Sequence, residues 1–267
     1  MDRGNVDLRR AVAVLQLPGS NCERETLRAV VLAGGRGEIV RWNEPASRLG
    51  AFGAYVIPGG FSFQDRIRAG AVAARLPVLD CVAARAREGA PVLGICNGAQ
   101  ILVEAGLVPG IEPGRLEVVL APNRMPGRDG YYTRWSLLGP AEASERCLFT
   151  RGMGDATLAV PMAHGEGRFT TRDAGIARVI GRYVALTYRT PEGSRAKEFP
   201  WNPNGSMAEA AGLTNARGNV LALMPHPERA VLRAQIPPWI DPEAMSDPES
   251  PGPGMRLFRA LVAALGA

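Results

Sequence analysis

The segment PVLGICNGAQ, residues 91–100, places a short apolar run directly before a cysteine that has a glycine two positions away on each side. The apolar residues 91–95 predict a buried strand, and the residues that follow the second glycine predict the start of a helix. A G-x-nucleophile-x-G pattern between a strand and a helix is typical of a sharp turn that presents a reactive side chain. The turn explains Gly94 and Gly98, because side chains at both positions would collide across it. This segment therefore predicts an α/β fold with Cys96 presented on a sharp turn between a strand and a helix.

Strand and helix signals alternate through the first 110 residues. Ser20 and Glu23 have the spacing of a capping box, which predicts a helix start, and Gly34 predicts the end of that helix. Strands separated by helices of this length predict βαβ crossovers and a parallel sheet that is covered on both faces. Strands are predicted at residues 11–17, 38–42, 54–57 and 91–95, and helices after Ser20, at residues 78–87 and from residue 99.

The second half of the chain reads differently, because strand signals follow one another with turns between them. The turn at residues 215–218 separates two apolar runs and predicts an antiparallel hairpin. Residues 238–254 are rich in proline and acidic residues and predict a surface loop, and residues 255–267 predict a closing helix. The sheet is therefore expected to gain antiparallel strands toward the C-terminus. Strands are predicted here at residues 116–120, 132–138, 157–163 and 176–188, and on both sides of the hairpin turn.

Composition limits the classes of function. Of the 267 residues, 46% are hydrophobic and 21% are charged, which is ordinary for a globular protein. The apolar run at residues 11–17 is too short for a membrane span or a complete signal sequence, so a cytoplasmic location is expected. The net charge of +5 comes almost wholly from arginines that alternate with acidic residues, which disfavours nucleic-acid binding. Lys197 is the only lysine, and the chain has no P-loop for a nucleotide.

The spacing of the cysteines leaves at least one thiol free to have a chemical role. Four cysteines lie far apart, without a CxxC pair, and the chain has only two histidines. This disfavours a zinc site and a disulfide scaffold, so no metal is expected. The four are Cys22, Cys81, Cys96 and Cys147.

A base for Cys96 is predicted in the segment MPHPE, residues 224–228, which follows an apolar strand. His226 can take the thiol proton and return it to a leaving amine, and Glu228 can orient the imidazole. The other histidine, His164, is followed by Glu166 with the same spacing, so the residues alone leave both histidines as candidates for the base. The turn at residues 94–98, called the elbow below, does not by itself prove a catalytic role, because it also allows Cys96 to be a buried structural cysteine.

Two backbone N–H groups are candidates for an oxyanion hole. The predicted turn places Cys96 at a helix N-terminus, which favours a thiolate, and directs the N–H of Asn97 toward the reacting carbonyl. The glycine turn after the strand at residues 54–57 should border the same crevice, because ligands of parallel sheets gather at the carboxyl ends of strands. Gly60 in this turn is the predicted second donor, and Gly59 and Phe61 are predicted to contact substrate.

Longer strings in the chain resemble a known family of enzymes. They are LPGSNCERET, PGGFSFQDRIRAGAVA, GICNGAQIL, PMAHGEGRF and WNPNGSMAEAAGLTNARGNVLALMPHPERA, and together they span about residues 12 to 230. They resemble the class I glutamine amidotransferases, whose triad consists of cysteine, histidine and glutamate. Within that family they are most similar to the glutaminases of phosphoribosylformylglycinamidine synthase, which serve purine biosynthesis. Two positions depart from the family pattern: Gln64 stands where glycine is expected, and Ala99 stands where a bulkier residue is common.

The resemblance implies one domain over residues 1–267, folded as a three-layer α/β/α sandwich with a mostly parallel central sheet. It implies that Cys96 is the nucleophile, His226 the base and Glu228 its orienter, and that Gln100 and His164 lie on the substrate side. It also implies an ATP-dependent synthetase subunit, which uses ammonia released from glutamine to convert formylglycinamide ribonucleotide to formylglycinamidine ribonucleotide. A small accessory subunit is expected as a further partner.

The same resemblance implies no cofactor in this chain, with ATP and magnesium expected on the partner synthetase. Two other readings remain open from the sequence. One is a different cysteine-elbow hydrolase of the same fold, similar to a peptidase or a deglycase. The other is a non-catalytic subunit that keeps the fold in order to bind its partner.

Overall fold

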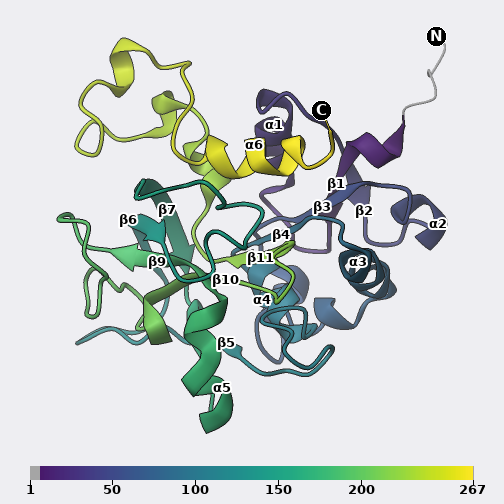
Figure 1. The fold of residues 1–267 in the computed structure, drawn as a ribbon, viewed down its shortest axis with the longest axis horizontal. Coiled ribbons are helices and arrows are strands. Elements are labelled where there is room, and N and C mark those ends of the chain that lie inside the picture. The colour runs from purple at the N-terminus through teal and green to yellow at the C-terminus, as the bar shows by residue number, and fades with distance from the viewer. Residues whose placement is uncertain (1–6, 267) are drawn as a thin grey trace.

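The computed structural model describes residues 7–266, which form a nine-stranded sheet with helices on both faces (Figure 1). The strand order is β2-β1-β3-β4-β11-β10-β9-β6-β7. The first five strands in this order are parallel, and each remaining strand is antiparallel to its neighbour. The predicted α/β sandwich with antiparallel additions is therefore confirmed.

The four inner parallel strands are almost wholly apolar because both of their faces are covered. The parallel set is β2 (Arg36–Arg41), β1 (Ala11–Gln16), β3 (Ala54–Ile57), β4 (Val92–Ile95) and β11 (Val220–Leu223). Every residue of β3, β4 and β11 is buried, whereas β2 at the edge is partly exposed. In this region the predicted strands match the observed ones to within two residues at each end.

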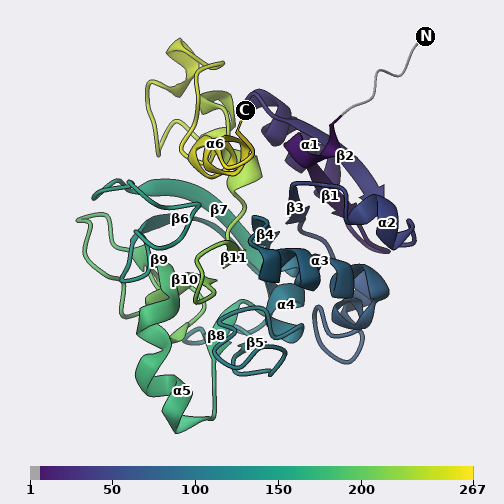
Figure 2. The same cartoon turned by 45° about the vertical axis from the view of Figure 1, so that its right-hand side comes forward.

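Helices cover the sheet on both sides (Figures 1 and 2). One face carries α1 (Glu23–Leu32) and α6 (Met255–Ala263), which contact each other, and the other carries α3 (Pro77–Glu88) and α4 (Asn97–Glu104). A short α2 (Ala46–Leu49) packs on α3. The predicted closing helix is thus α6, and its apolar side, which includes Leu257 and Phe258, is buried. Within residues 7–266, no helix has the length and apolar composition that crossing a membrane requires.

The capping box predicted for the first helix is wrong. Cys22 is the N-cap residue of α1 and makes no side-chain cap bond, whereas the Ser20 hydroxyl accepts from the Leu17 N–H inside the preceding turn. Ser20 lies outside the helix because it forms a bridge with Gly60 of the glycine turn after β3. That tertiary contact moves the helix start two residues beyond the predicted cap.

The antiparallel half contains β10 (Ala210–Thr214), β9 (Val184–Arg189), β6 (Tyr132–Pro140) and β7 (Leu158–His164). The predicted hairpin is confirmed, because β10 pairs with β11 across residues 215–219. A separate pair is formed by β5 (Val119–Ala121) and β8 (Arg168–Thr170). Figure 2 shows β7 curving back toward β4 and β11, and contacts of β7 with residues 227–230 hold it there.

The long strand predicted at residues 176–188 is wrong in its first half. Residues 174–179 form α5 (Ala174–Val179), and the strand β9 begins only at Val184. The Asp173 carboxylate caps α5 by accepting from the N–H groups of Gly175 and Ile176. A run of apolar residues looks alike in a strand and a short helix, and here the cap determines which one forms.

Candidate active site

Cys96 occupies the turn between β4 and α4 in a conformation that few residues adopt. Its φ is 52° and its ψ is −106°, and it is the N-cap residue of α4. Its N–H donates to the Leu223 carbonyl of β11 (2.8 Å), which fixes the turn to the neighbouring strand. The side chain is 7% exposed, and Sγ lies 3.6 Å from the Ala163 carbonyl oxygen of β7. The predicted elbow is present, with the thiol at a helix N-terminus.

Two glycines are required by the close packing of this turn. A Cβ at Gly98 would lie 1.9 Å from the carbonyl oxygen of Ile57 in β3. A Cβ at Gly94 would lie 2.6 Å from the Gly98 carbonyl oxygen on the opposite side of the turn. The Gly94 contact confirms the collision across the turn that was inferred from the sequence, whereas the Gly98 contact has a different cause, the close approach of α4 to the end of β3.

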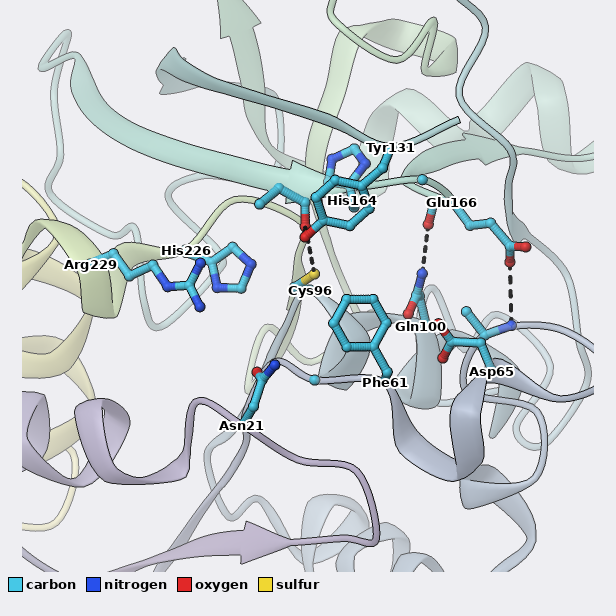
Figure 3. Close-up of a pocket in the computed structure, with 14 residues that line it drawn as sticks. Asn21, Phe61, Asp65, Cys96, Gln100, Tyr131, His164, Glu166, His226 and Arg229 are labelled. Carbon is cyan, nitrogen blue, oxygen red and sulfur yellow. Dashed lines mark hydrogen bonds between the residues drawn. The ribbon is translucent and has the colours of Figure 1, made fainter. Parts of the chain in front are cut away.

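His226 and Glu228 form a buried pair beside Cys96. Their side chains are 3% and 0% exposed, and Nδ1 of His226 lies 2.5 Å from Oε1 of Glu228. Burial alone lowers the pKa of His226, but the Glu228 carboxylate and the Cys96 thiol outweigh it, so the pKa is raised well above its ordinary value. A proton on Nδ1 is fixed by the carboxylate, which leaves Nε2 for the thiol. Figure 3 shows the imidazole and the thiol lying side by side at the pocket.

His164, the other candidate base, has a different environment. Its Nδ1 pairs with Oδ1 of Asn123 (3.1 Å), and its carboxylate neighbour in sequence, Glu166, accepts instead from the N–H of Ala69. Burial, followed by the charge of His226, lowers the pKa of His164 to about 3, so its ring is neutral at ordinary pH. His164 lines the pocket, and within residues 7–266 no carboxylate bonds its ring. In this part of the chain, His226 is the histidine that has the carboxylate a triad needs.

The two predicted oxyanion donors lie next to the pocket with their N–H groups free of acceptors within residues 7–266. Asn97 is the first residue of α4, where an N–H has no partner inside the helix. Gly60 lines the pocket, whereas the Phe61 N–H is already used by the Gly19 carbonyl (2.9 Å). Gly59 lies behind the imidazole, because a Cβ there would be 2.7 Å from Cε1 of His226.

The pocket has a volume of about 200 Å³ and opens beside Phe61 and Tyr131, whose rings are 6.2 Å apart. Gln100 lies in its wall one turn after Cys96, but its amide is already bonded, to the Glu166 carbonyl oxygen and to Nδ2 of Asn97. The lining consists of Asn21, Gly60, Phe61, Asp65, Ala69, Cys96, Gln100, Tyr131, Ala163, His164, Gly165, Glu166, His226 and Arg229.

The segment after the glycine turn has an unusual backbone. Phe63, Gln64, Asp65 and Ile67 all have φ between 52° and 72°, a region that non-glycine residues seldom adopt. This conformation explains why glycine is expected at position 64. Gln64 adopts the same conformation, with a φ of 60°. Its side chain is exposed and accepts hydrogen bonds from Arg66, and it is not among the residues that line the pocket. The second departure, Ala99, is fully buried in α4, away from the pocket wall.

Cys22 is a second thiol at the catalytic histidine that the sequence did not reveal. Its sulfur, a ring nitrogen of His226 and a carboxylate oxygen of Glu228 all lie within 4.8 Å of one another. Nη2 of Arg229 lies 3.1 Å from the Cys22 sulfur, and Nε of Arg229 bonds Glu25 (2.9 Å). A fixed guanidinium at this distance disfavours a metal cation among the three groups. Arg229 therefore closes one side of the pocket and links α1 to the catalytic pair.

Comparisons with known proteins agree with this geometry. The CobB/CobQ-like glutamine amidotransferase domain matches residues 9–263. The chain is 42% identical to phosphoribosylformylglycinamidine synthase subunit PurQ of Methanothrix thermoacetophila, over 94% of this chain and 96% of that protein. It is 39% identical to the subunit of the same name from Thermus thermophilus, over 82% and 89% of the two chains. Among solved structures, a chain of PurLQS from Thermotoga maritima superposes with a TM-score of 0.70 at 30% identity, over 95% of this chain and 97% of that one.

Proposed function

The chain belongs to the CobB/CobQ-like glutamine amidotransferase family, and from this premise we propose that it is the glutaminase subunit of a phosphoribosylformylglycinamidine synthase. It hydrolyses glutamine to glutamate and supplies ammonia for the conversion of formylglycinamide ribonucleotide to formylglycinamidine ribonucleotide in de novo purine biosynthesis. The observation that carries the proposal is a single pocket that holds Cys96 beside the buried His226–Glu228 pair.

The geometry supports a two-step reaction. The Cys96 thiolate attacks the side-chain amide carbon of glutamine, and the N–H groups of Asn97 and Gly60 stabilise the oxyanion. His226 gives its proton to the departing ammonia, which leaves a glutamyl thioester on Cys96. Water, deprotonated by His226, then hydrolyses the thioester and releases glutamate. Glu228 keeps the imidazole oriented and stabilises its charged form in both steps.

The partner follows from the chemistry and from the relatives. Ammonia has to reach an acceptor before it is protonated and lost, so the glutaminase needs a synthetase bound beside it. The relative from Thermotoga maritima belongs to the assembly PurLQS. We expect this chain to bind an ATP-dependent synthetase subunit and a small accessory subunit in the cytoplasm, with ATP and magnesium on the synthetase.

The decisive experiment combines the chain with its synthetase and compares two nitrogen sources. Cys96→Ala should abolish synthesis from glutamine and leave synthesis from added ammonium salt unchanged. Cys81→Ala is the matched control, because Cys81 is a partly exposed thiol of α3 outside the pocket. Loss of both activities in Cys96→Ala, or retention of the glutamine-dependent one, would contradict the proposed function.

A further inference from the structure

Arg229 lies close enough to the catalytic pair to compete for its carboxylate. Its Nε is 3.9 Å from Oε1 of Glu228, the same oxygen that lies 2.5 Å from Nδ1 of His226. Figure 3 shows Arg229 and His226 on the same side of Cys96. The second oxygen of Glu228, Oε2, is buried and has no hydrogen-bond partner within residues 7–266. A guanidinium is strongly attracted to a buried carboxylate at this distance, so the pairing of Glu228 with His226 depends on what holds Arg229 in place.

Two side chains at the start of α1 hold the guanidinium. Nε of Arg229 donates to Oε1 of Glu25 (2.9 Å), and Nη2 donates to the sulfur of Cys22 (3.1 Å). Cys22 is the N-cap residue of α1, and Glu25 follows three residues later in its first turn. Residues three apart lie on the same face of a helix, so both acceptors face Arg229.

The sulfur of Cys22 has a fixed position beside the imidazole. Cys22 is 1% exposed, and its sulfur lies 3.1 Å from Oδ1 of Asn21. A Cβ on Gly59 would lie 3.0 Å from this sulfur and 2.7 Å from Cε1 of His226, so the glycine turn closes the space behind both groups. Cys22 does not line the pocket, so it can act on the substrate only through the residues that it contacts.

A thiol suits this position better than other side chains. Burial is the largest influence on Cys22 and raises the pKa of its thiol, so the sulfur is neutral at ordinary pH. A neutral sulfur accepts a hydrogen bond from Arg229 without adding a negative charge beside Glu228. A carboxylate here would compete with Glu228 for the imidazole proton, and an apolar side chain would leave Nη2 without this acceptor.

We propose that Cys22 is a positioning residue of the triad, which together with Glu25 holds Arg229 away from Glu228 and so keeps the carboxylate paired with His226. This inference rests on the proposed function and deepens it. Without the sulfur, Arg229 can turn Nη2 toward Oε2 of Glu228. The carboxylate then divides its charge between the guanidinium and the imidazole, and the pKa of His226 falls. An imidazole with a lower pKa loses the proton needed by the departing ammonia at a lower pH.

The test measures glutamate release by the complex with the synthetase, as a function of pH and of glutamine concentration. Cys22→Ala removes the acceptor, and Cys22→Ser places an oxygen acceptor there. Glu25→Gln weakens the other contact with Arg229 at a half-exposed position, where the fold tolerates substitution. Cys147→Ala is the matched control, because it removes another buried thiol that lies outside the pocket.

The pH profile reports His226 because the variants leave its other neighbours in place. Besides Glu228 and Arg229, the titratable groups that face it are Cys96, His164 and Tyr131.

Cys22→Ala should lower kcat by about tenfold or more, because a small displacement in a catalytic site is costly. It should leave KM for glutamine almost unchanged, because the thiol does not touch the substrate, and it should move the alkaline limb of the kcat profile to lower pH. Glu25→Gln should act in the same direction more weakly. Cys22→Ser should recover most of the lost kcat and the original alkaline limb, and Cys147→Ala should match the wild type.

A wild-type kcat and pH profile in Cys22→Ala overturn the inference. A fall in kcat that Cys22→Ser shares, without movement of the alkaline limb, also overturns it, because the loss would then reflect packing alone. If Cys22→Ala does not fold, Glu25→Gln decides, and an unmoved alkaline limb in that variant overturns the inference. Absence of glutamate release by the wild-type complex contradicts the proposed function itself, so the two failures are distinguishable.

Discussion

The contact between α4 and β3 makes Gly98→Ala the most informative single change outside the triad. The new methyl carbon would lie 1.9 Å from the carbonyl oxygen of Ile57 and 2.7 Å from its carbonyl carbon, whereas real contacts of this kind are not shorter than 3.0 Å. Both of these are backbone atoms, so no side chain can rotate away to make room. Either the start of α4 or the end of β3 therefore has to move by about 1 Å.

Gly98→Ala should lower both the unfolding free energy and the reaction rate. Overpacking a close contact costs about 1–3 kcal/mol of unfolding free energy, and a backbone clash belongs at the upper end of this range. The same displacement moves the Asn97 N–H and the Cys96 sulfur relative to His226, which is held separately by the Pro161 carbonyl of β7 (2.7 Å). A misplacement of about 1 Å in a catalytic site costs on the order of 100-fold in rate.

Urea unfolding tests the loss of stability, and the rate at which a diazoketone analogue of glutamine labels Cys96 tests the loss of reactivity. The control is Gly181→Ala, since a Cβ at Gly181 meets only Glu142 at an ordinary 3.7 Å. The control should keep wild-type labelling and lose no stability. If Gly98→Ala unfolds and reacts like the wild type, the close approach of α4 to β3 does not position the nucleophile, and the reasoning is refuted.

Three further predictions concern the charged groups of the pocket. Glu228→Gln removes the charge that keeps the pKa of His226 high. Glutamate release in the complex should therefore fall by roughly 10⁴-fold. An activity near that of the wild type would contradict the triad. His226→Ala should abolish thioester formation, which is measured as loss of the covalent glutamyl adduct on Cys96. His164→Ala should still form the adduct and mainly lose stability. The reverse result would exchange the roles of the two histidines. Asp65→Asn should raise the thermal unfolding temperature at neutral pH. The folded-state pKa of Asp65, about 6, lies above the 3.8 of an unperturbed carboxyl, so its ionisation destabilises the fold above pH 6. The difference from wild type should shrink as the pH falls from about 6 to below 3.8, and a constant difference would exclude ionisation as its cause.

Local patterns were enough to predict most of the parallel half and the nucleophile. The apolar run at residues 11–17 and the fully buried β3 are short strands bounded by turn residues, and the elbow around Cys96 is defined by glycines within five positions. Two of the errors, Ser20 as a cap and residues 176–183 as a strand, share one cause. In each case a hydrogen-bonding or tertiary contact chose between local structures that the residue pattern allowed equally.

The site residues that were predicted each lie in a recognisable local motif: the glycine turn after β3, the turn around Cys96, the PMAHGEGRF string, or residues 224–228. Both histidines have a glutamate two positions later, and the direction in which each carboxylate turns depends on distant segments. Glu166 turns toward Ala69, whereas Glu228 stays with His226. Cys22 reaches the His226–Glu228 pair, and Asp65 reaches the pocket, through long-range contacts that no single-sequence pattern encodes.

The order of strands in the sheet has a consequence for how the enzyme comes into existence. Strand β4, which carries the nucleophile, lies between β3 and β11, and β11 leads directly into His226. A ribosome that adds roughly 5–20 residues per second needs on the order of ten seconds to go from residue 96 to residue 226. During that interval the nascent chain has a thiol without its histidine and a sheet without its central strand. Ammonia release is therefore withheld until His226 has been synthesised, so nascent chains that have not reached it cannot consume glutamine.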